Sequence, residues 1–326
     1  MFRQEPLIDT NSLGCFVTIA ESDSLTDAAR RLQITQSAVS QTLKLLEQNL
    51  GTTLVIRRTR PLRLTAAGIV LKQQADTILG DLRRLGSQVR VAAQQNLTQC
   101  RLGLMTSCSE VFGSPLIAQM EHKIEQLTLR SGLTPSLLQS FMNREVDILV
   151  SNEPLEDVTG LERYPLFRDP LLLAIPEHFN FAEDLPHREA LGQLAMHYPL
   201  IRYGRNTHIG AMTEVALRRI GMLTRVRYET DDTHTLMRFV RDGHSWGILS
   251  ALCLAQSIQN VEGLRLLPLD DSRHARRLFL VARAGELGRI PEEIANHIQQ
   301  FMEGQVLQQL QKIIPWLTRD SLQTIN

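Results

Sequence analysis

The sequence predicts an α+β protein overall: a helical N-terminal part, one long helix, and a larger α/β region that fills the rest of the chain. Three observations predict this architecture. Apolar residues recur at helical spacing between Leu13 and Leu50, and a longer apolar seam runs from Leu71 to Val89. Beyond residue 100, strand-like and helix-like segments alternate, which is typical of an α/β domain with mainly parallel sheets.

Composition places the chain among ordinary globular proteins. Its 326 residues predict two or three domains, and 43% of them are hydrophobic and 21% charged. No apolar run approaches the roughly 18 residues that a membrane span needs. The N-terminus lacks the apolar stretch of a secretion signal, so we expect a cytoplasmic protein.

The four cysteines, Cys15, Cys100, Cys108 and Cys253, form no CxxC motif. This spacing favours buried free thiols over a zinc site or a disulfide framework. A redox pair of Cys100 and Cys108 is the alternative.

Two short helices separated by three residues are predicted before residue 51. The first is expected from Leu25 to Leu32, because its apolar residues are three and four positions apart. The second is expected to begin after Thr35, a plausible cap, and to end at Gly51, since glycine commonly follows a helix C-terminus.

The second helix shows a polar face opposite its apolar one. Short hydrogen-bonding side chains and one lysine suit base edges and phosphates in a major groove. The residues that we expect to contact DNA from this helix are Gln36, Ser37, Ser40, Gln41 and Lys44.

A basic hairpin is predicted next, with strands at Leu54–Ile56 and Leu62–Leu64. Its tip carries the remaining expected DNA contacts, Arg57, Arg58 and Arg60. Residues 25–65 hold seven basic side chains against two acidic ones, in a chain whose formal net charge is zero. Such local basic charge favours nucleic-acid binding. The alternative is a small helical domain with a solvated arginine loop.

Residues 28–68, AARRLQITQSAVSQTLKLLEQNLGTTLVIRRTRPLRLTAAG, resemble the winged helix-turn-helix of LysR-type transcriptional regulators. The Ala-Ala pair, the Ser/Gln-rich helix start, the arginine hairpin and the LTAAG motif follow the order of that family. The likeness is dense over residues 10–90 and diffuse afterwards. Val55-Ile56 stands where the family usually has a phenylalanine, a change in the core. The resemblance implies a DNA-binding domain over residues 1–65 that binds double-stranded promoter DNA.

A long helix followed by a hinge is predicted over residues 66–97. Its narrow seam suits a partner helix, although a single amphipathic helix that folds onto its own domain is the alternative. The resemblance implies that this linker pairs two subunits, with dimers assembling further into a tetramer. The residues expected at the dimer contact are Leu71, Ile78, Leu82, Leu85 and Val89.

The C-terminal region, residues 98–303, contains the alternating strands and helices. Strands are expected at Cys100–Met105, Val146–Val150, Leu171–Ile175, Leu200–Tyr203, Val226–Thr230, Gly247–Ser250, Leu264–Leu267 and Leu278–Ala282. Helices are expected at Pro115–Leu127, Ile209–Ile220, Thr233–Arg241 and Glu292–Phe301. The resemblance implies an effector-binding domain similar to periplasmic binding proteins. Its subdomain I would be 98–167 plus 269–303 and its subdomain II 168–268, with crossings near Leu166–Pro170 and Pro268. Residues 304–326 are expected to form a helical extension that either covers this domain or contributes to subunit contacts.

Ligands in such folds lie beyond the carboxyl ends of strands, where helix N-termini offer free N–H groups. Hydroxyls, a helix start and nearby arginines suit a small, anionic effector. The expected effector contacts are Thr106, Ser107, Ser109, Ser151, Arg202, Thr207, His208 and Asp231. The alternative is that these residues are ordinary caps and surface arginines.

One motif argues for an enzyme, because residues 243–247 read GHSWG, a GxSxG pattern. A hydrolase elbow needs a strand before the serine and a helix after it, whereas here a helix precedes Ser245 and a strand follows. No phosphate-binding loop is present and the histidines are dispersed, so neither a cofactor nor a metal is expected. We therefore predict a non-enzymatic regulator. Its partners would be DNA, an effector and further copies of itself, with RNA polymerase as a further candidate.

Overall fold

The computed structural model describes residues 8–56, 61–92, 97–222, 224–269 and 274–323. They form two compact units: residues 1–95 with 283–288, and residues 96–282 with 289–326. No helix within these described ranges has the length and apolar character to cross a membrane.

The first unit contains a helix-turn-helix, a short hairpin and a long helix. Its elements are α1 (Thr10–Ala20), α2 (Leu25–Leu32), α3 (Gln36–Leu50), β1 (Val55–Ile56), β2 (Arg63–Leu64) and α4 (Ala66–Ala92). The predicted bounds of the two short helices are confirmed. The Thr35 side chain accepts a hydrogen bond from the Ala38 amide, and Gly51 ends α3 with φ of 65°.

The core of this unit lies between α1, α2 and α3. Its fully buried side chains include Phe16, Ile19, Leu43 and Leu46. The hairpin is fastened to this core by Glu47, a buried carboxylate that accepts a hydrogen bond of 2.9 Å from the Leu54 amide. Because the anchor is on α3 itself, the position of the hairpin is tied to that helix.

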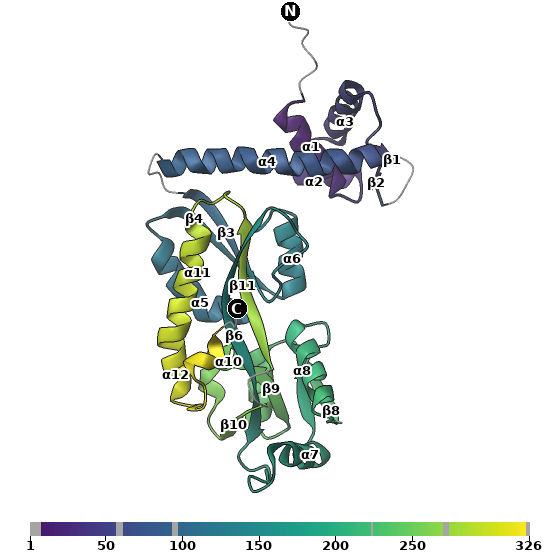
Figure 1. Ribbon diagram of the computed structural model, residues 1–326. Coiled ribbons are helices and arrows are strands. Elements are labelled where there is room, and N and C mark those ends of the chain that lie inside the picture. The colour runs from purple at the N-terminus through teal and green to yellow at the C-terminus, as the bar shows by residue number, and fades with distance from the viewer. Residues whose placement is uncertain (1–7, 57–60, 93–96, 223, 270–273, 324–326) are drawn as a thin grey trace, which may run out of the picture. The chain divides into compact units, whose positions relative to one another are not determined.

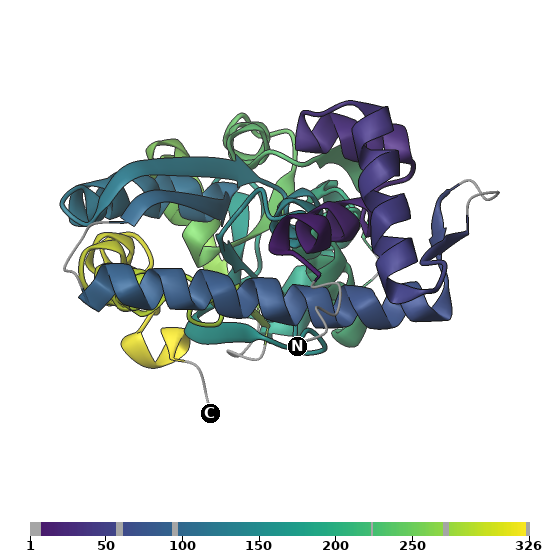
Figure 2. The same ribbon diagram turned by 90° about the horizontal axis from the view of Figure 1, so that it is seen from above.

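The start of α4 is also fixed to the hairpin. Thr65 donates its hydroxyl to the Thr53 carbonyl at 2.8 Å and accepts from the Gly68 amide at 3.0 Å. Thr65 thus caps the N-terminus of α4 with its side chain. Figure 2 shows α4 as a continuous rod, with the hairpin beside the end at which the helix begins.

The second unit holds the remaining elements. Its helices are α5 (Thr106–Met120), α6 (Thr134–Met142), α7 (His187–His197), α8 (His208–Arg219), α9 (Thr233–Arg241), α10 (Ala251–Gln256), the 3-10 helix η1 (Ile258–Asn260), α11 (Ile290–Phe301), the π-helix η2 (Met302–Val306), α12 (Leu307–Gln311) and α13 (Arg319–Leu322). Its strands are β3 (Leu97–Met105), β4 (Ile124–Gly132), β5 (Ile148–Ser151), β6 (Leu161–Pro176), β7 (Leu200–Tyr203), β8 (Val226–Thr230), β9 (Trp246–Ser250), β10 (Leu264–Pro268) and β11 (Ala275–Arg283).

The strands of this unit form a mixed sheet in the order β4-β3-β5-β11-β6-β9-β7-β8, with β10 paired to β6. Pairing is parallel where β3 meets β4 and β5 and where β7 meets β8 and β9. It is antiparallel around the central β6 and β11. The first lobe is built on β3 to β5 and the second on β7 to β10, with β6 and β11 running between them (Figure 1). The expected first crossing, Leu166–Pro170, lies within β6.

The prediction of a helix over Pro115–Leu127 was wrong. The helix α5 begins earlier, at Thr106, and the chain then forms strand β4 from Ile124. Pro115 lies inside α5 rather than at its start. Strand β4 is at the edge of the sheet with mostly polar or half-buried side chains, so its sequence carries a weak alternation.

The residues after Phe301 continue the core of the second unit. Leu310, Ile314 and Leu317 are completely buried, and the Trp316 indole donates to the Leu266 carbonyl of β10 at 3.4 Å. The segment from Met302 to Leu322, called the C-terminal extension below, thus reaches from α11 to a strand of the second lobe. The sequence left its role open between covering this domain and subunit contacts.

Candidate functional site

Helix α3 presents one polar face to solvent. Gln36, Ser37, Gln41 and Lys44 are exposed and Ser40 is half-buried, while Val39, Leu43 and Leu46 on the opposite face are buried. The five residues of α3 that are expected to contact DNA are therefore on one surface of that helix. The hairpin arginines Arg57, Arg58 and Arg60 lie outside the described residues.

The apolar seam of α4 divides into two parts. Leu71 packs within its own unit, against the cluster of Leu13, Val17 and the fully buried Ala75. The other four residues expected at a dimer contact are solvent-exposed, namely Ile78 (46%), Leu82 (44%), Leu85 (57%) and Val89 (60%). This second part of the seam leaves an apolar stripe without a partner in the described part of the chain.

In the second unit, a cleft lies where the N-termini of four helices converge. Its walls include Thr106 and Ser107 of α5, Thr134 of α6, His208 of α8 and Thr233 of α9. Free backbone N–H groups and helix dipoles at such ends favour negative charge. The space enclosed is small, about 70 Å³.

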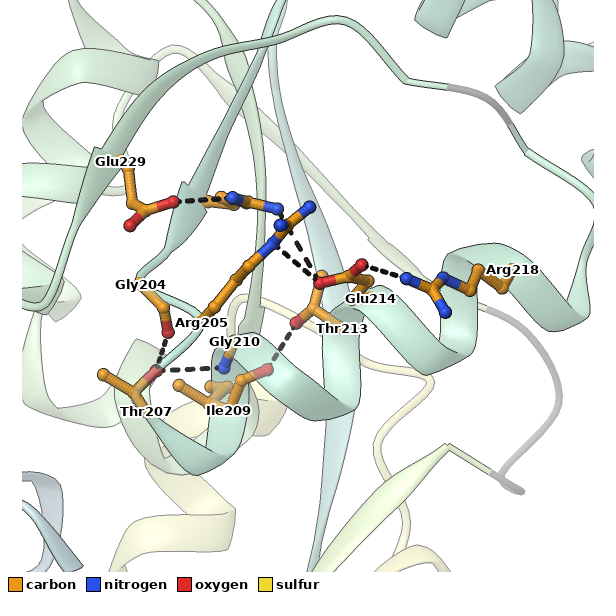
Figure 3. Close-up of polar contacts among 10 residues, drawn as sticks. Gly204, Arg205, Thr207, Ile209, Gly210, Thr213, Glu214, Arg218 and Glu229 are labelled. Atoms are coloured by element: carbon orange, nitrogen blue, oxygen red, sulfur yellow. Dashed lines mark hydrogen bonds and ion pairs between the residues drawn. The ribbon is translucent and has the colours of Figure 1, made fainter. Parts of the chain in front are cut away.

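The N-terminus of α8 is held tightly against the end of β7. The Thr207 hydroxyl donates to the Gly204 carbonyl at 2.7 Å and accepts from the Gly210 amide at 3.0 Å (Figure 3). A Cβ atom at position 210 would lie 2.1 Å from the Gly204 carbonyl oxygen, so only glycine fits there without a shift of the backbone. This contact orients the N-terminus of α8 toward the cleft.

The strongest charge in the cleft wall is Arg276 of β11, which is only 6% exposed. Its Nε donates to Asp169 Oδ2 at 2.6 Å, and its Nη2 donates to the hydroxyls of Ser107 and Ser250, both at 3.1 Å. The other Asp169 oxygen accepts from the Leu252 amide at 2.8 Å. Although burial opposes the charge, the Asp169 carboxylate raises the pKa of Arg276 above its ordinary range. The guanidinium is therefore a fixed cation.

Two titratable groups beside Arg276 are kept neutral. Burial, and then the charge of Arg276, lower the pKa of His208 below its ordinary value. Burial raises the pKa of Tyr203 well above its ordinary range, and the Tyr203 hydroxyl is 2.9 Å from that of Thr233. The described cleft thus offers one permanent positive charge, neutral hydrogen-bonding groups, and the carboxylates of Asp231 and Asp232.

The structure brings together five of the eight residues expected at the effector site: Thr106, Ser107, Thr207, His208 and Asp231 line the cleft. Ser109 lies farther along α5, outside the lining. Ser151 is fully buried at the end of β5, where its hydroxyl contacts the backbone of Glu153. Arg202 pairs with Glu229 at 2.7 Å, beside the Glu214–Arg205 and Glu214–Arg218 pairs of α8 (Figure 3). Because side chains alternate along β7, Tyr203 faces the cleft and Arg202 does not.

Sequence reasoning missed the side chain that dominates the cleft. Arg276 lies in an arginine-rich stretch of β11, and no motif marks it as buried. An inward-facing arginine in an otherwise apolar strand pattern was the available signal, since Leu278 and Leu280 share its side of the strand. Thr134, Asn152 and Gln256 were also missed; Asn152 accepts a 2.9 Å hydrogen bond from the Thr134 hydroxyl across the first lobe.

The GxSxG motif is placed between α9 and β9, in the helix-to-strand order that the sequence indicated. The Ser245 hydroxyl is fully buried and has no hydrogen-bond partner among the described residues. It therefore faces no cleft from which a substrate could reach it. The four cysteines are free and buried, and burial raises the pKa of both Cys100 and Cys108 to about 12. No cluster of three or more metal-ligating side chains occurs in the described ranges.

The described residues thus hold a helix-turn-helix with an exposed polar face and, in a separate two-lobed unit, a cleft whose wall contains a buried guanidinium. Residues 10–69 match the family described as bacterial regulatory helix-turn-helix protein, lysR family, and residues 93–302 match the LysR substrate binding domain. The chain belongs to the LysR family. Its two matched regions are the helix-turn-helix and the substrate binding domain of that family, in the order that the sequence predicted.

Curated relatives are similar to part of the chain. The HTH-type transcriptional regulator HdfR of Yersinia pestis (strain Pestoides F) is 32% identical over 149 residues, which is 45% of this chain and 50% of HdfR. The HdfR of Yersinia pseudotuberculosis serotype O:1b (strain IP 31758) matches equally. The chain spans about half the length of these curated relatives.

Solved structures share the fold. OxyR from Pseudomonas aeruginosa has a TM-score of 0.66 and 19% identity, covering 90% of this chain and 95% of its own. ArgP from Mycobacterium tuberculosis has a TM-score of 0.62 and 21% identity, covering 91% and 98%. A hydrogen-peroxide-bound mutant of Corynebacterium glutamicum OxyR has a TM-score of 0.58 and 22% identity, covering 98% and 100%.

Proposed function

We propose that this protein binds promoter DNA as a homo-oligomer in the cytoplasm and responds to a small anionic molecule in the cleft of its second unit. The observation that supports the ligand class is the convergence of four helix N-termini on a cleft whose wall holds the fixed guanidinium of Arg276. Asp231, which is exposed in the same lining, favours a ligand that carries a hydrogen-bond donor as well as its negative charge.

The proposed DNA contacts are Gln36, Ser37, Ser40, Gln41 and Lys44 on α3, together with the hairpin arginines. Glu47 supports this proposal, because its hydrogen bond to the Leu54 amide holds the hairpin against α3 and so fixes the two elements relative to each other. The proposed dimer contact is the exposed part of the α4 seam. Two helix-turn-helix regions related by a two-fold axis would contact DNA half-sites about one helical turn, or a multiple of it, apart. The proposed partners of the DNA-bound protein also include RNA polymerase.

The proposed response to the ligand is a change in the arrangement of the lobes and subunits. A ligand shifts a conformational equilibrium only if it binds one arrangement more tightly than another. The small size of the cleft supports this reasoning, since a ligand that does not fit between the lobes in this arrangement favours a wider separation of them. That change would alter the packing of the paired subunits and thereby the spacing of their helix-turn-helix regions along DNA.

The experiment that tests the proposal is genome-wide capture of DNA by the purified protein, followed by footprinting of the strongest site with a panel of small carboxylates. We expect a two-fold protected site whose extent changes with a subset of the carboxylates. The response, but not the binding of DNA, should weaken in Ser107→Ala, which removes a cleft hydroxyl and keeps the buried charge pair. Absence of an enriched site at low salt would refute the regulator itself.

The contacts of α3 are tested by the salt dependence of binding to the captured site. Lys44→Ala should weaken binding to all sequences and reduce the slope of log K against log salt by about 1, because one phosphate contact is lost. Lys44→Arg is the matched control and should retain the slope. Gln36→Ala should instead relax the sequence preference. Equal slopes for the alanine variant and the wild type would remove Lys44 from the contact surface.

A further inference from the structure

The C-terminal extension closes a second cavity in the same unit, separate from the cleft. It has a volume of about 250 Å³ and lies between α5, α10 and the extension. Residues 305, 306 and 309 form one wall, and they lie beyond residue 302, where the match with the LysR substrate binding domain ends. This chain therefore builds the cavity with residues outside the matched domain.

The chemistry of the second cavity differs from that of the cleft. Three glutamines, Gln256, Gln305 and Gln309, contribute amides, and each amide can both donate and accept. Glu110 contributes a carboxylate, which is engaged by His234 Nε2 at 3.0 Å. No Lys, Arg or His is among the described residues of the lining, so an anion would find no counter-charge there. Phe301, Val111 and Val306 supply an apolar side.

Gln256 is the unusual member of this lining. It is 8% exposed, and neither its amide nitrogen nor its amide oxygen has a hydrogen-bond partner among the described residues. A buried amide without partners is unfavourable, and such groups in folded proteins usually have a partner in protein, water or ligand. Because no hydrogen bond holds this side chain, it can turn toward a ligand without losing one.

We propose that the second cavity binds a small, neutral molecule with paired donor and acceptor groups, such as a primary carboxamide or a urea. Gln256, Gln305 and Gln309 would hold its polar end, and Phe301, Val111 and Val306 its apolar end. The same Gln256 also lines the cleft. Its amide can serve one cavity at a time, so a ligand in the second cavity changes the lining of the first. This coupling rests on the function proposed above for the cleft; the second site does not.

The site is tested by methyl NMR of the full-length protein, with valine and isoleucine methyl groups labelled. Propionamide is the probe and propionate, of the same shape but charged, is its control. We expect saturable shifts of the Val111 and Val306 methyl signals with propionamide, assigned through Val→Ile variants, and none with propionate. Affinity in the millimolar range is expected of so small a ligand.

Two neighbouring glutamines of α12 provide a matched pair of variants. Gln309 lines the cavity whereas Gln308 does not, and both are exposed, so neither substitution threatens the fold. Gln309→Leu should weaken propionamide binding about three- to tenfold, the value of one hydrogen bond, and Gln308→Leu should leave it unchanged. Gln256→Leu should weaken binding similarly and raise the thermal unfolding temperature, because an unpartnered amide is replaced by an apolar group. Unsaturable shifts, or equal affinities in Gln308→Leu and Gln309→Leu, would overturn the site.

The coupling has its own signal, because the Ile209 methyl groups line the cleft and not the second cavity. Propionamide should shift the Ile209 signal in the wild type and leave it in place in Gln256→Leu at the same occupancy. An unmoved Ile209 signal at saturation in the wild type would overturn the coupling. If the cleft binds no carboxylate, the proposed function is contradicted. The Val111 and Val306 shifts caused by propionamide should still be observed, because they report on the second cavity alone.

Discussion

Gly68, in the first turn of α4, packs directly against the backbone of the hairpin. A Cβ atom at position 68 would lie 2.1 Å from the Leu54 carbonyl oxygen, which also accepts a hydrogen bond from the Thr65 amide at 3.0 Å. Gly68→Ala should therefore lower the free energy of unfolding of the first unit by about 1–3 kcal/mol, since backbone must move to admit the methyl group. Thermal and urea denaturation measure this change.

The control for that prediction is another glycine in a helix of the same unit. A Cβ atom at Gly14 of α1 would have no other group within 4 Å. Gly14→Ala should thus stabilise the unit by about 0.5–1 kcal/mol, because alanine loses less conformational freedom in a helix. Loss of stability in both variants alike would show that the Leu54 contact is not the cause.

His208 makes a prediction about pH. Its pKa lies below the ordinary 6.5 because of burial and the charge of Arg276, so the free protein holds the ring neutral near pH 7. A bound anion would offset Arg276 and raise that pKa, so binding takes up a proton. The affinity for an anionic ligand should therefore rise as pH falls toward the lowered pKa of His208 in the free protein, by at most tenfold per pH unit, and level off below that pKa. Calorimetry in buffers of different ionisation enthalpy measures the uptake, and His208→Asn should abolish it; a pH-independent affinity in the wild type would contradict this account.

At the scale of elements, α4 combines two roles along one seam. Its first turns complete the core of their own unit through Leu71 and Ala75. The later turns expose Ile78, Leu82 and Leu85 over a helix of 27 residues, which is about 40 Å long. A seam that is buried at one end and exposed at the other favours attachment of the helix to one subunit and pairing with a second.

Leu82→Glu should weaken self-association at least tenfold, because a charge replaces an apolar side chain that pairing would bury. Analytical ultracentrifugation measures the dissociation constant. Gln73→Glu adds the same charge on the opposite side of α4 and should leave association unchanged. If the two variants associate equally well, the exposed seam is not the contact.

At the scale of the whole molecule, the C-terminal extension is part of the second unit and not a loose tail. Leu310, Ile314 and Leu317 are as completely buried as Leu173 of the central strand β6. Arg319 pairs with Glu303, and the Thr318 and Ser321 side chains cap the last helix. The extension therefore stabilises the lobes against which it packs.

Leu310→Ala should lower the free energy of unfolding of the second unit by about 2–5 kcal/mol, the usual range for a leucine cavity in a packed core. Denaturation followed by tryptophan fluorescence suits this test, because Trp246 and Trp316 are both in that unit. Gln308→Ala, at an exposed position of the same helix, should change stability little. A Leu310→Ala protein as stable as the wild type would show the extension to be dispensable.

Most elements could be predicted from local patterns. Thr35 and Thr65 mark helix starts by their capping hydroxyls, Gly51 marks a helix end through its positive φ, and α9, β7 and β8 have the predicted bounds. The edge strand β4 and the true start of α5 could not, because partly exposed strands alternate weakly and Pro115 suggested a later helix start. Of the candidate cleft residues, Thr106 and Asp231 follow predicted strand ends and line the cleft, whereas Ser151 follows another strand end and is buried away from it. Arg202 lies on the opposite side of β7.

By itself, the sequence determined the family, the bounds and polar face of α3, the seam of α4 and most of the strand ends that surround the cleft. Periodicity, caps and charge are local properties of the chain. Only the tertiary structure decided which groups meet. Asp169 and Arg276 are 107 positions apart, and their contact depends on the pairing of β6 with β11. Gln256 borders two cavities only because α10 packs between α5 and the extension. Such contacts follow from topology, which no local pattern encodes.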